Sequence, residues 1–243
     1  MRRNTPNCAN IAEEQQRLLE ALAGLDPRKV AATLEPFATE ERRARFQGVF
    51  AERLDSVTVL MDAPHDPHNG AAVLRSCDAF GVQRLHVVER LETFLAARTV
   101  SRGAEQWVEA RTYATGAEAI AALARSGHEL VATHPAGDLA PRELRDIPRL
   151  ALVLGNERDG IHAELAAACT RTVRIGMRGF VESLNVSVTA AILLEQATAG
   201  RPGDLSDEER ALLYARALIL SVPQAPAILA ARAGISVRVP QTG

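Results

Sequence analysis

The chain of 243 residues is poor in cysteine, and its three cysteines, Cys8, Cys77 and Cys169, lie far apart. An odd number of cysteines, with no histidines at metal-ligand spacing, predicts neither a disulfide framework nor a zinc site. No apolar run in the sequence approaches the roughly 20 residues of a membrane-spanning helix, and the N-terminus shows no secretory signal pattern. We therefore expect a cytoplasmic protein with reduced cysteines, of which Cys77 and Cys169 are packed.

Signatures of several common enzyme classes are also missing from the sequence. No G-x-G-x-x-G follows an apolar run and no P-loop pattern occurs, so a conventional dinucleotide or nucleotide site is not expected. No G-x-S-x-G elbow appears, which argues against serine hydrolysis. The net charge of −2 and the pI of about 6.3 argue, taken alone, against a nucleic-acid partner, because Lys and Arg contacts to phosphate carry most of such affinity.

One cluster of arginines makes a segment of the chain locally basic, although the net charge of the whole chain is mildly negative. Arg42, Arg43, Arg45 and Arg53 lie close together in the sequence. They form either a local basic face that suits nucleic acid or one side of a salt-bridged helix with the glutamates of the same segment. The sequence leaves both interpretations open.

After about residue 55, short apolar runs rich in Val, Leu and Ile alternate with helical segments. Runs without polar alternation are typical of strands that helices cover on both faces. The alternation therefore predicts an α/β fold with a mostly parallel, doubly wound sheet and right-handed crossovers. The expected strands are 57–62, 85–88, 129–133, 150–155 and 172–176, and the expected helices between them are 70–80, 116–126, 162–168 and 184–197.

Helical segments are expected on both sides of this core. The pattern of residues 11–25 predicts a helix that stops near Gly24, Asp26 and Pro27, and a second helix is expected over 39–54. After the core, Ser206 is placed to cap a helix over 204–220, and the final stretch is expected to be partly loose. We expect three parts: an N-terminal helical extension (1–55), a core domain (56–200) and a C-terminal helical tail (201–243).

Polar residues follow three of the expected strands, at the strand ends where open α/β sheets bind ligands. In N-G-A-A-V-L-R, Asn69 opens a helix and Arg75 follows within two turns; in L-G-N-E-R-D-G-I, Glu157 follows a glycine that permits close backbone approach. In S-L-N-V-S-V, Ser183 and Asn185 precede a long apolar helix. Taken singly, Asn69 and Arg75 are equally well explained as a helix cap and a surface arginine, whereas an exposed turn residue is the preferred explanation of Glu157 and helix capping that of Ser183 and Asn185.

Taken together and in this order, N-G-A-A-V-L-R with D-A-F-G, then L-G-N-E-R-D-G-I, then S-L-N-V-S-V strongly resemble the three motifs of the SPOUT-class RNA ribose methyltransferases of the TrmH type. The resemblance covers roughly residues 40–200, and the L-S-D-E-E-R-A-L-L-Y-A-R stretch is similar to the helical tail of the tRNA-modifying members. It implies 2′-O-methylation of a ribose in tRNA by S-adenosylmethionine, with the D-loop guanosine at position 18 as the expected target.

The resemblance also implies a fold and a site. The C-terminal part of the sheet, about residues 131–197, is expected to form a deep trefoil knot that holds the cofactor in a bent shape, in a homodimer with the active site near the subunit interface and without a metal. The residues expected to bind the cofactor are Thr133, Gly155, Ile175, Met177 and Leu184. The residues that match the active-site positions of the motifs are Asn69, Arg75, Glu157, Ser183 and Asn185.

The chemistry of this reaction constrains what Arg75 can do. A sulfonium methyl is already electrophilic, so the protein must mainly place the ribose oxygen and help its proton to leave. Arginine stays protonated in proteins. We therefore expect Arg75 to position the target phosphate and ribose and to stabilise the developing oxyanion rather than to act as a free base. Glu182 departs from the glutamine of tRNA-modifying members and puts a negative charge beside the expected RNA path.

Three alternatives remain beside tRNA methylation. Ribosomal RNA is the first, although its modifying enzymes usually carry a separate RNA-binding domain and residues 1–55 look too short for one. A non-catalytic, knotted RNA-binding module is the second, and it would bind RNA regardless of Arg75. The third is a small-molecule α/β enzyme, which would be active with no RNA present.

Overall fold

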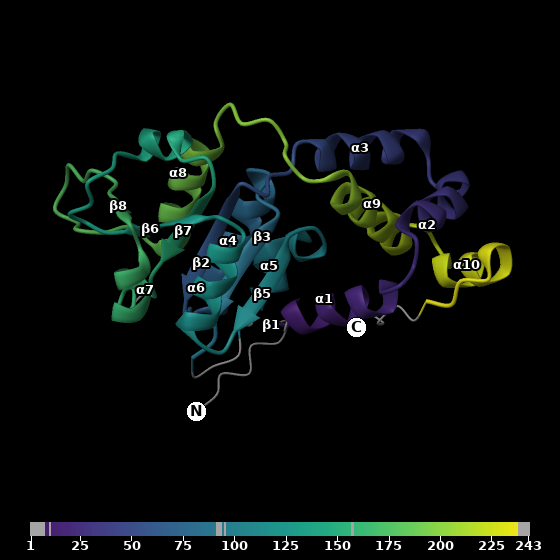
Figure 1. Ribbon diagram of the computed structural model, residues 1–243, viewed down its shortest axis with the longest axis horizontal. Helices are drawn as coiled ribbons and strands as arrows, with labels where there is room; N and C mark the ends of the chain where they lie inside the picture. The colour runs from purple at the N-terminus through teal and green to yellow at the C-terminus, as the bar shows by residue number, and fades with distance from the viewer. Residues whose placement is uncertain (1–7, 10, 91–93, 95, 157, 238–243) are drawn as a thin grey trace. The chain divides into compact units, whose positions relative to one another are not determined.

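The computed structural model describes residues 8–9, 11–90, 94, 96–156 and 158–237. The chain divides into two compact units, whose elements are labelled in Figure 1. Unit 1 consists of Met1–Ala12 and Leu54–Arg201, and unit 2 of Glu13–Arg53 and Pro202–Gly243. Segments from both ends of the chain therefore share unit 2, whereas the three motif segments all belong to unit 1.

Unit 1 is built on a six-stranded parallel sheet. Its strands are β2 (Val57–Asp62), β3 (Arg84–Val88), β5 (Glu109–Tyr113), β6 (Glu129–Thr133), β7 (Leu150–Leu154) and β8 (Arg171–Val173). They lie in the order β5-β3-β2-β7-β6-β8, and every pair of neighbours is parallel. Every residue of the central strands β2 and β7 is buried, which explains their continuous apolar sequences. The predicted α/β class with a parallel sheet is confirmed.

Two strands differ from the prediction. The sequence pattern misses β5, whose residues E-A-R-T-Y include only one that is fully buried, because β5 is an edge strand that pairs with β3 alone. The predicted end of the strand 172–176 is wrong, because β8 ends at Val173, three residues earlier. Arg174 leaves the ladder, and its backbone N–H donates to the carbonyl oxygen of Leu139 at 3.1 Å.

Helices cover both faces of this sheet. Those that carry most of the packing are α4 (Pro67–Ala79), α8 (Val186–Thr198), α6 (Gly116–Arg125) and α7 (Ala163–Ala168). Buried side chains of α4 and α8 belong to one core cluster, and those of α6 and α7 belong to another. The short elements of unit 1 are β1 (Cys8–Ala9), β4 (Ala96–Ala97), α5 (Arg98–Ser101), η2 (Ala104–Gln106) and η3 (Pro141–Asp146).

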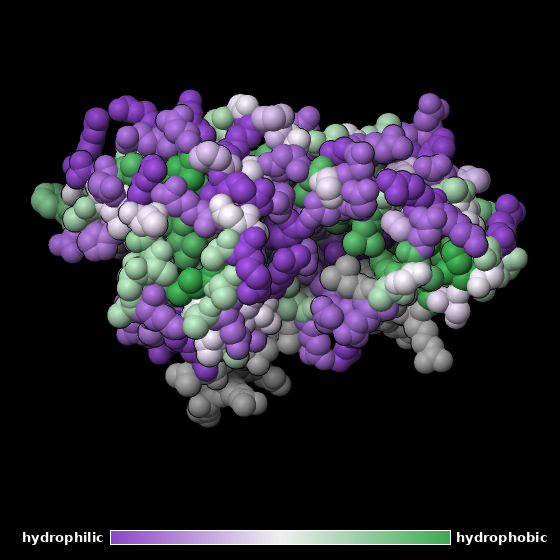
Figure 2. Space-filling view, in the orientation of Figure 1, coloured by the Kyte–Doolittle hydropathy of each residue, from purple (hydrophilic) through white to green (hydrophobic). Residues whose placement is uncertain are grey.

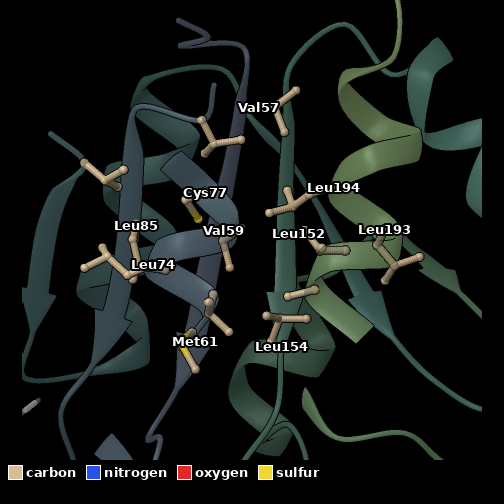
Figure 3. Close-up of a cluster of buried hydrophobic side chains, with 14 of the residues drawn as sticks. Val57, Val59, Met61, Leu74, Cys77, Leu85, Leu152, Leu154, Leu193 and Leu194 are labelled. Carbon is tan, nitrogen blue, oxygen red and sulfur yellow. The ribbon is translucent and has the colours of Figure 1, made fainter. Parts of the chain in front are cut away.

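The two clusters reflect the alternation of side chains along each strand. Val59 and Met61 of β2 face the cluster of α4 and α8, whereas Leu60, between them, joins the cluster of α6 and α7. Figure 3 shows the first cluster, in which side chains of β2 and β7 meet Leu193 and Leu194 of α8. The sheet is thereby fixed from both sides, and its strand ends provide a rigid support for loops.

The cysteines whose side chains the structure describes are packed, as expected. Cys77 is fully buried in the first core cluster, and Cys169 is half-buried. The Cys169 thiol donates to the carbonyl oxygen of Leu165 at 3.2 Å, and burial raises its pKa to about 11. Neither Cys77 nor Cys169 is part of a disulfide, and Cys169 stays protonated at neutral pH, so it is a packing residue rather than a nucleophile.

Helix α4 begins three residues before the predicted start at Gly70. Asp66 caps it by accepting a hydrogen bond from the backbone N–H of His68 at 2.9 Å, and Pro67 occupies the first turn. A capping carboxylate followed by proline is a strong helix start, because proline fixes the backbone angle and lacks an N–H that would otherwise be unsatisfied. Asn69 consequently lies inside the helix, and its interpretation as the cap is wrong.

Unit 2 is helical. Its elements are α1 (Ile11–Leu22, which begins in the last residues of Met1–Ala12), α2 (Pro27–Leu34), η1 (Glu35–Phe37), α3 (Glu40–Ala51), α9 (Asp207–Ser221) and α10 (Ala225–Ala233). Val30 and Leu34 of α2 pack with Leu218 and Ile219 of α9 and with Leu229 of α10. Residues from both ends of the chain thus build one hydrophobic core.

The sequence prediction missed two of these helices. Asp26 and Pro27 were expected to end a helix, but Asp26 caps α2 through the backbone N–H of Arg28 at 2.9 Å, and Pro27 is its first residue. The expectation of a partly loose final stretch is wrong for α10, which buries Leu229 completely, while residues 238–243 lie outside the described part. Ser206 caps α9 together with Glu209, as predicted.

The arginine cluster does not form a single exposed face. Arg53 is only 1% exposed, so the hypothesis that it joins a basic surface is wrong. Arg42 and Arg45 are exposed on α3, and the Arg42 guanidinium donates to the carbonyl oxygen of Ser221 at 3.2 Å. The candidate basic face is therefore reduced to part of α3.

Among the described residues, no single helix is long and apolar enough to cross a membrane. The helices α9 and α10 reach that length and apolarity only when they are taken together, and they are bent by 115° at the break between them. Figure 2 shows hydrophilic side chains over most of the visible face, with smaller apolar areas between them.

Candidate active site

A pocket of about 450 Å³ opens at the carboxyl ends of β6, β7 and β8. Ligands of parallel α/β sheets bind at this edge, because the strand ends leave backbone groups and loop side chains free to face a ligand. Three stretches of chain build the walls: residues 133–135 at the end of β6, residues 155–156 and 160–161 after β7, and residues between 173 and 193 from the end of β8 into α8. The second and third contain motif segments, so the structure brings together sequences about 20 to 30 residues apart.

All five residues expected to bind the cofactor line this pocket. Thr133 lies at the end of β6, and its hydroxyl donates to the carbonyl oxygen of Val153 at 3.2 Å. Gly155 follows β7 directly, while Ile175, Met177 and Leu184 lie on the chain between β8 and α8. Together these residues give the pocket one wall of backbone at Gly155 and another wall of apolar side chains from Ile175, Met177 and Leu184. Their role in cofactor binding stays a prediction.

The turn after β7 leaves no room for a side chain at Gly155. A Cβ atom there would lie 2.3 Å from the carbonyl carbon of Gly160 and 2.6 Å from the nitrogen of Ile161, well inside contact distance. Asn156 closes the turn through backbone hydrogen bonds to and from Gly160, at 3.0 and 3.2 Å. Gly160 has a φ of 71°, in the left-handed region that favours glycine.

The side chain of Asn156 stabilises the same turn from inside. Its Oδ1 accepts hydrogen bonds from the backbone N–H groups of Arg158 and Asp159, at 2.9 and 2.8 Å. Asn156 is buried and also lines the pocket. Asn156 is not among the site residues predicted from the sequence, although asparagine before a turn commonly bonds the backbone two residues on. Glu157, the next residue in the sequence and one of the candidate site residues, lies outside the described residues.

A buried carboxylate at the end of β2 anchors the segment that follows this turn. Asp62 Oδ2 accepts from both the backbone N–H and the Nδ1 of His162, at 2.7 and 2.9 Å, and Oδ1 accepts from Nε of Arg90 at 3.0 Å. The Asp62 side chain is completely buried, so these partners replace the water that it loses. Sequence reasoning missed this anchor; its one signal is an acidic residue that ends an apolar strand.

Asn69 and Asn185 join α4 to α8. Nδ2 of Asn185 donates to Oδ1 of Asn69 at 3.0 Å. Asn185 also caps α8, because its Oδ1 accepts from the backbone N–H and the hydroxyl of Ser187 at 2.8 and 2.6 Å. The capping interpretation of Asn185 is therefore confirmed, and the same side chain links two motif segments that are 116 positions apart in sequence.

The remaining candidates lie at different distances from this link. Ser183 and Asn185 line the pocket and are exposed. Arg75 is exposed on α4, six residues after Asn69, which corresponds to about 9 Å along a helix axis. Neither Asn69 nor Arg75 is among the residues that line the pocket. Ser183 and Asn185 thus lie at the pocket, Asn69 is joined to it through its hydrogen bond with Asn185, and Arg75 lies outside the lining.

Comparison with known protein families gives one match in this region of the chain. The model of the SpoU rRNA Methylase family matches residues 56–195, which contain the sheet and all three motif segments. Among individual proteins, the tRNA (guanosine(18)-2'-O)-methyltransferase of Escherichia coli K12 is 35% identical over 164 residues, which cover 66% of this chain and 70% of that protein.

Two solved structures are similar as well. The A. aeolicus TrmH/SpoU tRNA modifying enzyme aligns with a TM-score of 0.68 and 26% identity, covering 75% of this chain and 98% of that one. The SpoU methyltransferase AviRb from Streptomyces viridochromogenes, solved in complex with the cofactor AdoMet, aligns with a TM-score of 0.53 and 27% identity, covering 61% of this chain and 60% of that one.

Proposed function

This chain belongs to the SpoU rRNA methylase family, and on that premise we propose that it methylates the 2′-hydroxyl of a ribose in tRNA, using S-adenosylmethionine. The target we propose is guanosine 18, for which the E. coli relative is named. The observation that carries the proposal is the pocket at the strand ends, where two motif segments meet and a third is joined to them by the Asn69–Asn185 hydrogen bond. The methyltransferase domain proposed here spans 56–200, between helical parts at 1–55 and 201–243.

The pocket suits S-adenosylmethionine in size and chemistry. Its volume of about 450 Å³ falls within the usual range for small-molecule sites. Ile175, Met177 and Leu184 offer apolar contact for a purine ring, and the tight turn at Gly155 presents backbone groups without a side chain in the way. When bound, the cofactor supplies a methyl group that its sulfonium already makes electrophilic. The protein residues then have to place the ribose and stabilise its oxygen.

We assign the main electrostatic task to Arg75. Its permanently charged, planar guanidinium suits a phosphate and a developing ribose oxyanion. Because the guanidinium is already protonated, it cannot accept the proton as a base. The proton of the 2′-hydroxyl then leaves with the help of the target phosphate. Asn69 and Ser183 position Arg75 and the substrate, and Glu157 and Asn185 organise the strand ends. The Asn185–Asn69 hydrogen bond supports a shared role for these two residues.

We further propose a homodimer with the active site near its interface. Arg75 is exposed and does not line the pocket of its own chain, as expected if it acts at a site completed by a partner. Val188 and Ile192, one helical turn apart on α8, are 46% and 37% exposed. Apolar side chains at this spacing form a stripe that a second copy could cover.

A trefoil knot over about residues 131–197 belongs to the same proposal. The strand order supports it, because the chain runs from β6 to β7 and then returns past β6 to form β8 on the far side. The chain after β8 passes along the turn that follows β7 before it enters α8, since both stretches line the same pocket. A cytoplasmic location, where tRNA is available, is also part of the proposal.

Transfer of labelled methyl groups from S-adenosylmethionine tests this function. Unmodified tRNA transcript, ribosomal RNA and a reaction without RNA are compared, and labelled RNA is digested to nucleosides. A 2′-O-methylguanosine product from tRNA alone supports the proposal. The family name makes ribosomal RNA the second candidate substrate. Labelling of ribosomal RNA alone would show that it, and not tRNA, is the substrate. Label incorporation without RNA, or none in any reaction, would contradict RNA methylation.

A further inference from the structure

The stretch between β8 and α8 has two different sides. Ile175 and Met177 line the pocket, whereas Arg174 and Arg178 are exposed. Figure 1 shows the chain leaving β8 as a loop at the outer edge of unit 1. The stretch returns to the pocket at Glu182, which lines it. The exposed side chains of this stretch therefore lie next in sequence to residues that line the pocket.

Phe180 projects from this stretch with its side chain wholly in solvent. Its exposed fraction is 109%, compared with 61% for Val181 beside it and 41% for Phe37. Phe37 is also in contact with a charged group, because the guanidinium of Arg232 lies 4.9 Å from its ring centre. Single exposed apolar residues are common, but a fully exposed aromatic ring, two residues before the pocket-lining Glu182, offers a free face for stacking.

The charge beside Phe180 favours one kind of partner. Among the described residues, neither Arg174 nor Arg178 forms an ion pair, so both guanidinium groups are free to meet an anion. Their two positive charges outnumber that of Glu182 in this stretch, although the whole chain carries −2. An aromatic face flanked by arginines matches single-stranded RNA, whose bases stack on rings and whose phosphates pair with guanidinium groups.

We propose that Phe180 and Arg178 bind the substrate RNA beside the target nucleotide, Phe180 by stacking on an unpaired base and Arg178 by contact with a phosphate. The inference rests on the proposed function and adds to it the way in which an unstacked nucleotide is held. Lifting the target nucleotide out of the base stack would present its ribose to the pocket, and unstacking costs free energy. Stacking on Phe180 offsets part of that cost.

Three substitutions at Phe180 separate stacking from simple apolar contact. Affinity for unmodified tRNA transcript is measured by filter binding for Phe180→Ala, Phe180→Leu and Phe180→Trp. We expect the dissociation constant to rise at least about fivefold in the alanine and leucine variants and to stay near the wild-type value in the tryptophan variant. The new tryptophan, added to Trp107, should also show fluorescence quenching when RNA binds.

Arg178→Ala tests the phosphate contact, with the exposed Arg125 of α6 as its matched control. Arg178→Ala should weaken RNA binding and lower the salt dependence of affinity by about one unit of slope, whereas Arg125→Ala should change neither. Affinity for S-adenosylmethionine, measured by calorimetry, should stay within about twofold of wild type in every variant.

Light scattering, which measures the oligomeric state, distinguishes RNA from a second copy of the chain as the molecule that contacts Phe180. RNA affinity unchanged in Phe180→Ala, or a loss of the oligomer in that variant, would overturn the inference. Equal affinity of the leucine and wild-type proteins would overturn stacking. These outcomes differ from failure of the proposed function, in which the wild-type protein itself neither binds nor methylates RNA.

Discussion

The side-chain amide of Asn185 donates a hydrogen bond to the side-chain oxygen of Asn69 across 3.0 Å, and so connects the first turn of α4 to the first residue before α8. Asn185 uses its other polar atom to cap α8. One side chain thus serves a local structural task and a long-range one. This division allows the two tasks to be separated by substitution.

Asn185→Asp keeps the cap and removes the link. A carboxylate still accepts from the N–H of Ser187, but it has no N–H to donate and places its charge against the Asn69 oxygen. We expect a melting temperature within a few degrees of wild type and a fall in methyl transfer of about tenfold or more. Asn185→Ala, which loses both interactions, should additionally lower stability by about 1 kcal/mol. Normal turnover of the aspartate variant would show that the link is not needed.

Gly155→Ala should close the cofactor pocket. The added Cβ would lie 2.3 Å from the carbonyl carbon of Gly160, so the turn must shift. Calorimetric titration with S-adenosylmethionine should show affinity lowered by about tenfold or more. Gly176→Ala is the matched control, because a Cβ there meets no atom within 4 Å. Similar affinities for the two variants in folded protein would contradict the placement of the cofactor beside Gly155.

Arg75→Lys should be almost as damaging as Arg75→Ala. Lysine keeps the charge but lacks the planar guanidinium that we propose to contact phosphate and ribose together. On saturating RNA, we expect the methyl-transfer rate of both variants to fall by about a hundredfold or more, while affinity for S-adenosylmethionine and the melting temperature remain close to wild type. Near-normal turnover in Arg75→Lys would contradict the role assigned to the guanidinium.

His86 should make the fold sensitive to acid. It is buried in β3, and its Nδ1 lies 2.8 Å from the hydroxyl of Tyr113; desolvation, aided by nearby positive charges of which Arg111 contributes most, lowers its pKa from 6.5 to about 3. The unfolded chain therefore takes up a proton below pH 6.5 that the folded chain takes up only near pH 3, so stability falls as the pH drops through this window.

Urea unfolding at pH 7 and pH 5 measures this effect. The contribution of His86 to the loss of stability should be about 2 kcal/mol, from 1.5 pH units at about 1.4 kcal/mol each. His86→Gln should lose correspondingly less stability between the two pH values than wild type. His68→Gln, at an exposed histidine whose backbone N–H alone makes a hydrogen bond to Asp66, serves as the control. An unchanged pH dependence in His86→Gln would assign the acid sensitivity to other groups.

The sequence predicts the buried parts of the sheet well and its margins poorly. Strands such as Val57–Asp62 and Leu150–Leu154 are buried on both faces, so their composition is nearly all apolar. The strand Glu109–Tyr113 is not predicted from an apolar pattern, because it lies at the edge of the sheet and is only partly buried. Helix α2 is not predicted from the sequence, because Asp26 and Pro27 can end one helix as well as begin the next. Only the packing of Val30 and Leu34 decides between these alternatives.

For the site, local patterns locate the strand ends but not the partners of each side chain. Asn69 and Asn185, or Asp62 and His162, are about 100 residues apart in sequence, and no periodicity connects them. The resemblance to a family supplied the cofactor residues, whose convergence on one pocket is a property of the fold. Phe180 is an ordinary residue in the sequence, and only its complete exposure distinguishes it.

The most direct test of the central claim compares two tRNAs that differ by one oxygen atom. One carries guanosine at position 18 and the other carries 2′-deoxyguanosine there, and transfer of labelled methyl from S-adenosylmethionine is followed for both. We predict transfer to the first tRNA, with 2′-O-methylguanosine recovered after digestion, and none to the second. Equal labelling of the two tRNAs would contradict methylation of this 2′-hydroxyl.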